Sequence, residues 1–186
     1  MSIHLTRDRC RSDMIWFTSD HHFNHENIIR HDNRPFPSLQ EMTIALVDYW
    51  NELVQPSDVV WHLGDFALSW GKKHATMIDA LLASLHGEKH LIVGNHDRKE
   101  VTKNTRWASV SHYHEIKAST SHPKIVLCHY SIRSWNGAHH GSWMLHGHSH
   151  GNLPDMGGKS LDVGVMCHHY RPISLEQVAA FMEHRD

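Results

Sequence analysis

The chain has 186 residues, of which 40% are hydrophobic and 20% are charged, and its formal net charge is -2. This composition is typical of a soluble globular protein with one domain, and it excludes a disordered tail or two ordinary domains. The lack of an overall basic bias argues against nonspecific binding to nucleic acid, and no apolar run reaches the length of a membrane span.

Residues 1–13 are polar and lack the apolar stretch of a signal peptide, so they are predicted to be a leader before a single domain over residues 14–186. The three cysteines, Cys10, Cys128 and Cys167, form no CxxC pair, which favours a reducing cytoplasm. The 22 histidines are spread along the chain and favour metal chemistry, because histidine is the commonest metal ligand.

The apolar pattern predicts alternating strands and helices in the first half of the chain and mostly strands in the second half. Strands are expected at 14–19, 58–63, 88–93, 110–118, 124–128, 142–145 and 159–165, and helices at 38–54, 72–86 and 174–184. Ser38 and Ser174 begin capping boxes for two of the helices. This order favours an α/β fold with two sheets flanked by helices over a single doubly wound sheet.

Five of the predicted strands are followed at once by residues of metal-binding types. These residues are Asp20-His21-His22, Gly64-Asp65, Gly94-Asn95-His96-Asp97, His129, and His146-Gly147-His148-Ser149-His150. Because strands of an α/β sheet end at a common edge, segments far apart in the sequence can converge there on one site.

The residue types in these segments indicate the kind of metal. Carboxylate oxygen, imidazole nitrogen and amide oxygen together suit a divalent transition metal such as manganese, iron or zinc. In an extended backbone Asp20 and His22 would face one side, as would His148 and His150. Asp65 follows a glycine, which permits a sharp turn, and its two oxygens would allow it to bridge two ions.

The five segments together resemble the calcineurin-like metallophosphoesterases, whose pattern is DxH, GD, GNH[DE], a lone His and GHxH. The resemblance covers about residues 14–150 and implies a four-layer α/β/β/α sandwich of two mixed β-sheets flanked by helices. It implies two divalent metal ions, with manganese preferred and iron, zinc or nickel as alternatives. The implied ligands are Asp20, His22 and His150 for one ion and Asn95, His129 and His148 for the other, with Asp65 shared.

The resemblance also implies roles for residues that do not bind metal. His96 would be the catalytic histidine, oriented by Asp97, while a hydroxide that bridges the ions attacks phosphorus in line. Arg133, four residues after His129, is a candidate to bind the substrate phosphate, and His25, Asn24 and Arg98 are weaker candidates. The stretch SDHHFNHENII, followed by NRPF, resembles small bacterial and phage members, which usually have glycine where this chain has Asn24.

The predicted function is hydrolysis of phosphate esters, with a phosphodiesterase slightly favoured over a phosphomonoesterase. The expected substrate is a small phosphate ester or nucleotide, with nucleic acid only as a substrate and no membrane partner. A binding scaffold of the same fold that does not turn over is the alternative. His146 is expected to pack near the ligands, with a supporting role left open, and the run 167–169 (Cys-His-His) is expected to bind no metal.

Overall fold

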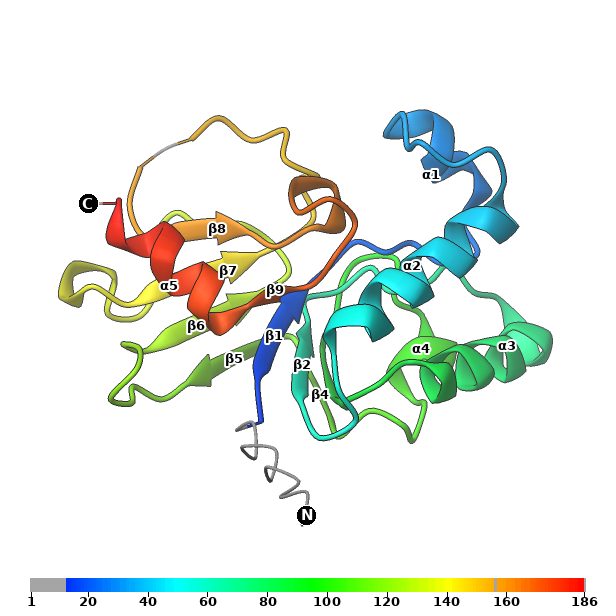
Figure 1. Cartoon of the computed structure of the whole chain (residues 1–186), viewed down its shortest axis with the longest axis horizontal. Helices are drawn as coiled ribbons and strands as arrows, with labels where there is room; N and C mark the ends of the chain where they lie inside the picture. The colour runs from blue at the N-terminus through cyan, green and yellow to red at the C-terminus, as the bar shows by residue number, and fades with distance from the viewer. Residues whose placement is uncertain (1–12, 156, 186) are drawn as a thin grey trace, which may run out of the picture.

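The computed structural model describes residues 13–155 and 157–185, and Figure 1 shows the arrangement of their strands and helices. Apart from Asp13, the predicted polar leader lies outside the described residues. The strands form two sheets, with the orders β4-β3-β2-β1-β9 and β5-β6-β7-β8. The strands are β1 (Ile15–Thr18), β2 (Val59–His62), β3 (Glu88–Ile92), β4 (Ser109–Ser111), β5 (Tyr113–Ile116), β6 (Ile125–Cys128), β7 (Trp143–His146), β8 (Ser160–Asp162) and β9 (Ile173–Ser174).

Both sheets are mixed. In the first, β1, β2, β3 and β4 are parallel, and β9 pairs antiparallel with β1. In the second, β6, β7 and β8 are parallel, and β5 pairs antiparallel with β6. The prediction of an α/β fold with two mixed sheets flanked by helices is therefore confirmed.

The described helices lie on both sides of the first sheet (Figure 1). They are α1 (Glu26–His31), α2 (Leu39–Leu53), α3 (Gly71–Ser84), α4 (Lys99–Thr102) and α5 (Leu175–Glu183), with short 3-10 turns at Ala138–His140 and Val165–Cys167. Trp50 of α2 and Ile78 of α3 belong to the same apolar cluster as Trp16 of β1, whereas Val178 of α5 belongs to the cluster that contains Phe17 of β1. Because neighbouring strand residues point to opposite faces, α5 lies on the other side of β1 from α2 and α3.

The space between the sheets is filled by a second apolar cluster. Phe17, Leu63 and Ile92 of the first sheet region pack there with Leu127 and Leu145 of the second sheet, and all five side chains are fully buried. This shared core fixes the two sheets against each other. None of the described helices is long and apolar enough to cross a lipid bilayer.

The two predicted capping boxes mark helix starts correctly. The Ser38 side chain accepts a hydrogen bond from the backbone of Glu41, and Ser174 and Gln177 form the full reciprocal pair. One strand prediction is wrong: residues 110–118 are divided between β4 and β5, which belong to different sheets. The apolar pattern continues through this stretch, so it does not reveal that the chain changes sheets at His112.

Candidate metal centre

The five predicted segments follow β1, β2, β3, β6 and β7, and backbone hydrogen bonds draw them together. The Asp20 backbone N–H donates to the Gly64 carbonyl at 3.0 Å, and the His22 N–H donates to the Asp65 carbonyl at 3.0 Å. The Gly147 N–H donates to the His129 carbonyl at 2.9 Å. The loops that leave the two sheets are therefore joined pairwise in the backbone, which brings their side chains to one place.

Most of the predicted metal ligands have a left-handed backbone. This holds for Asp20, His22, Asp65, His148 and His150, whose φ angles lie between 51° and 68°. The prediction that extended backbone places Asp20 and His22 on one side is therefore wrong, and the same correction applies to His148 and His150. Non-glycine residues in this region are uncommon and strained, and such residues cluster at functional sites where the surroundings hold them.

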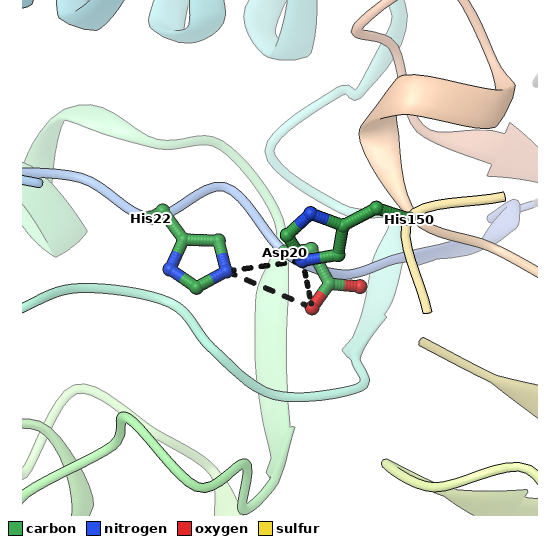
Figure 2. A group of neighbouring side chains, drawn as sticks. All are labelled: Asp20, His22 and His150. Carbon is green, nitrogen blue, oxygen red and sulfur yellow. Dashed lines mark hydrogen bonds and ion pairs between the residues drawn. The ribbon is translucent and has the colours of Figure 1, made fainter. Parts of the chain in front are cut away.

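Asp20, His22 and His150 form one group of donor atoms (Figure 2). His22 Nε2 lies 3.3 Å from His150 Nε2 and 4.0 Å from Asp20 Oδ1, and His150 Nε2 lies 3.5 Å from Asp20 Oδ1. Asp20 Oδ2 accepts hydrogen bonds from the Ser19 hydroxyl and the His148 backbone. Asp20 Oδ1 is buried and has no hydrogen-bond partner among the described residues.

A second group consists of Asp65, His129 and His148, whose donor atoms lie within 4.8 Å of one another. Asp65 Oδ2 is 3.5 Å from His129 Nε2 and 3.6 Å from His22 Nε2, so one oxygen stands between the two groups. The Asn95 amide oxygen is 3.1 Å from His129 Nε2. The structure thus brings together all seven residues predicted as ligands.

Two hydrogen bonds determine which ring nitrogen of His129 and of His150 faces the other donor atoms. His129 Nδ1 is 2.7 Å from the Leu63 carbonyl, and His150 Nδ1 is 2.7 Å from an Asp32 carboxylate oxygen. Both oxygens are acceptors, so each Nδ1 carries the proton. His129 Nε2 then faces Asp65 and His150 Nε2 faces Asp20, and once either nitrogen has lost its proton it carries the lone pair that a metal ion would bind.

The electrostatics of the groups follow from burial and from these close pairs. Burial lowers the pKa of His22 to about 3. For His150, burial lowers the pKa, but the neighbouring carboxylates of Asp20 and Asp32 outweigh it and raise the pKa to about 10. For Asp65, burial raises the pKa, but hydrogen bonding and charge at His129 bring it to about 2. Ionised Asp65 therefore faces a neutral His22 ring, whereas the protonated ring of His150 places its positive charge beside Asp20 and Asp32.

These donors fit divalent metal ions. The separations of 3.1–4.0 Å between paired donors are close to the edges of a coordination polyhedron with metal–ligand bonds of about 2.0–2.2 Å. A cation beside the buried Asp20 Oδ1 would supply the partner that this oxygen lacks among the described residues.

Asp97 does not orient His96 as predicted. Its Oδ2 accepts the backbone N–H groups of Asp65 at 2.8 Å and Gly94 at 2.9 Å, and its Oδ1 accepts that of Phe66 at 2.8 Å. Burial raises the pKa of Asp97 to about 6, although the three N–H groups oppose this. Asp97 is therefore buried beneath the loops after β2 and β3, and its hydrogen bonds hold these two loops together.

His96 lies at the edge of the centre. Its backbone N–H donates to Asp65 Oδ1 at 2.8 Å, and its ring centroid is 5.1 Å from that of His22 and 5.7 Å from that of His25. One ring nitrogen forms a third group of donor atoms with His22 and Asp65. His96 is only partly buried, so its ring is open to solvent as well as close to the predicted ligands.

The predicted substrate-binding residues are placed differently from one another. His25 Nδ1 lies 3.3 Å from His22 Nδ1, at the edge of the centre. Asn24 has φ 60°, which explains why asparagine can stand in for glycine, and its amide donates to the Leu68 carbonyl rather than facing the centre. Arg133 is exposed on the loop after β6 without a hydrogen bond among the described residues, and Arg98 stacks on Trp70.

His146 and the run 167–169, which were not predicted as metal ligands, lie outside the groups of donor atoms. His146 is buried at the end of β7, and its ring bonds the Gly147 carbonyl. His168 bonds the Asp162 carbonyl, and the run 167–169 is in no group of donors among the described residues. The residue that sequence analysis missed is Asp32, whose only signal was its position just before the NRPF stretch.

Comparisons with known proteins place the chain in a family. It is 35% identical over 175 residues to an uncharacterized protein of Methanocaldococcus jannaschii, MJ1445, covering 91% of each chain. It is 30% identical over 164 residues to the gene 66 protein of Mycobacterium phage D29, covering 75% of this chain and 79% of the phage protein. No protein-family model matches the chain.

The chain therefore belongs to the same family as the archaeal protein and the phage gene 66 protein. Among solved structures, a protein of unknown function from Aquifex aeolicus, AQ665, is similar with a TM-score of 0.71 and 23% identity. The likeness covers 91% of this chain and 99% of that protein, so the two share a fold.

Proposed function

We propose that this protein is a calcineurin-like metallophosphoesterase that binds two divalent transition-metal ions and hydrolyses phosphate esters. The observation that carries the proposal is the position of Asp65 Oδ2, 3.6 Å from His22 Nε2 and 3.5 Å from His129 Nε2. One carboxylate oxygen between two groups of nitrogen and oxygen donors is the arrangement that a pair of ions about 3.5–4 Å apart requires.

Each metal position has its own ligands in this proposal. Asp20, His22 and His150 hold the first ion, Asn95, His129 and His148 hold the second, and Asp65 is shared. When bound, two such ions polarise the phosphate and lower the pKa of a bound water. Manganese is the preferred metal, with iron, zinc or nickel as alternatives, because the donors combine oxygen and imidazole nitrogen.

His96 is the proposed acid of the reaction. Its backbone is held on Asp65, while its ring is partly exposed and lies beside His22. From this position the ring can donate a proton to the leaving oxygen or a hydrogen bond to the phosphoryl group. A group with this role contributes about 10²–10⁴-fold in rate.

The substrate is proposed to be a small phosphate ester or nucleotide, and a diester is slightly favoured. The side chains of Asn95 and His148 are exposed, which supports direct access of substrate to the second metal position. His25 lies close enough to contact a bound phosphate, and Arg133 is a cation available on a neighbouring loop. Free cysteines at 128 and 167 support a cytoplasmic location for a single-domain enzyme.

The test is hydrolysis of bis-p-nitrophenyl phosphate and p-nitrophenyl phosphate by protein loaded with Mn²⁺, with and without chelator. We expect turnover that chelator abolishes and that Asp65→Asn lowers by at least about 10²-fold. Asp79→Asn is the matched control, because Asp79 is an exposed aspartate paired with Arg106. Failure to cleave either compound with two ions bound would support the non-catalytic scaffold instead.

A second variant separates the roles of His96. His96→Ala should keep two bound ions and lose rate if the ring acts on the substrate. Metal analysis of the purified variant measures this directly. A loss of one ion would instead make His96 a ligand, as its place in a group with His22 and Asp65 allows.

A further inference from the structure

Asp32 connects one of the proposed ligands to a different part of the fold. It follows the last residue of α1, and its side chain is 10% exposed. Its Oδ2 accepts a hydrogen bond from His150 Nδ1 at 2.7 Å. The bond joins residues 118 positions apart, so it holds the loop after β7 against the end of α1.

Arg34 extends this connection to the backbone that carries Asp20. It is 4% exposed, and it bonds Asp32 Oδ2 through Nε at 3.3 Å and through Nη2 at 3.2 Å. Nη2 also donates to the Asp20 carbonyl at 2.8 Å, and Nη1 donates to the His21 carbonyl at 2.9 Å. One guanidinium therefore fixes the loop after β1 and the carboxylate that holds His150, because its donors are arranged in a rigid fork.

We propose that Asp32 and Arg34 are a positioning pair that makes the Asp20, His22 and His150 position the tighter of the two metal positions. This inference rests on the proposed function, since it assumes that two ions bind. Asp32 keeps the proton on His150 Nδ1 and strengthens the ring as a ligand, as carboxylates that bond ligating histidines do. Arg34 holds that carboxylate and the Asp20 backbone in one geometry.

The second metal position lacks an equivalent pair among the described residues. His129 Nδ1 bonds the neutral carbonyl of Leu63 instead of a carboxylate. The second position also has the neutral amide of Asn95 as a ligand, whereas the first position has the charged carboxylate of Asp20. The ring of His148 is exposed and packs edge-on against Tyr130, 4.7 Å away between centroids. With weaker donors and a less constrained ring, this position should bind its ion less tightly.

The experiment is calorimetric titration of metal-free protein with Mn²⁺ alone, without substrate. Wild-type protein should bind two ions in two steps of different affinity. His148→Ala should remove the weaker step and thereby identify it. Asp32→Asn keeps the size of the side chain and an acceptor oxygen, and it should weaken the tighter step by about 10–100-fold while the weaker step is unchanged.

Two further variants complete the test. Arg34→Lys keeps a positive charge but cannot bond both carbonyls and Asp32, and it should weaken the same step. Asp79→Asn, which also removes an aspartate–arginine ion pair, should change neither step. Unchanged affinity in both Asp32→Asn and Arg34→Lys, or a loss confined to the weaker step, would overturn the inference. Wild-type protein that binds fewer than two ions would contradict the proposed function instead.

Discussion

Replacing Asp97 with asparagine should destabilise the protein, because its carboxylate is the acceptor for three buried backbone N–H groups. Asparagine has a single acceptor oxygen. If that oxygen takes the place of Oδ2, it still accepts from Asp65 and Gly94, but the new amide nitrogen faces the N–H of Phe66. Two donors then meet where a donor met an acceptor.

The magnitude follows from these three bonds. Two bonds change from a charged to a neutral acceptor, at about 1 kcal/mol each, and one buried N–H loses its acceptor, at about 1–3 kcal/mol. Burial disfavours the charge, as its effect on the pKa of Asp97 indicates, so removing the charge offsets part of this cost. The net loss in the free energy of unfolding should be about 2–4 kcal/mol.

Urea unfolding in chelator, followed by tryptophan fluorescence, measures this loss without any contribution from bound metal. Asp79→Asn serves as the control, because its ion pair with Arg106 is exposed to solvent and should contribute little to stability. A difference of less than about 0.5 kcal/mol between Asp97→Asn and wild type would refute the reasoning that Asp97 fastens the two loops.

Two other substitutions test the surroundings of the centre and the second sheet. Gly64→Ala should lower both the stability of the fold and the affinity for metal. The φ angle of Gly64 is +97°, and a Cβ there would lie 2.6 Å from both Gly94 N and His129 Nδ1. A Mn²⁺ titration identical to that of the wild type would contradict this. Hydrogen bonding from Lys124 lowers the pKa of Glu115 from 4.5 to about 2, so Glu115 stabilises the fold above pH 4.5 and this contribution is lost as pH falls toward 2. Glu115→Gln should therefore reduce the loss of stability between pH 4.5 and 2 in urea unfolding, and an unchanged pH profile would argue against the ion pair.

Much of the fold follows from local patterns in the sequence. The capping boxes at Ser38 and Ser174 define helix starts, because a side chain oxygen must satisfy the first N–H groups. The break between β4 and β5 could not be predicted, since periodicity specifies which face is apolar and not which sheet a strand joins. The short helix α1 and strand β9 are likewise too short for a periodic signal.

The candidate centre shows the same division. The convergence of residues that directly follow an apolar strand could be predicted from the sequence, because the strands of a sheet end at a common edge. The left-handed backbone at Asp20 and His150 could not, because it depends on how neighbouring loops bond each other. The hydrogen-bond partners of Asp32 and Asp97 could not be predicted either. Each carboxylate bonds a segment that is remote in the sequence, and neither bond requires a particular spacing of residues.

Anomalous diffraction from crystals loaded with Mn²⁺ tests the central claim most directly. The account predicts two peaks about 3.5–4 Å apart, with Asp65 Oδ2 in contact with both. One peak should be bound by Asp20, His22 and His150, and the other by Asn95, His129 and His148. A single peak, or two peaks that do not share Asp65, would contradict a dinuclear centre in this protein.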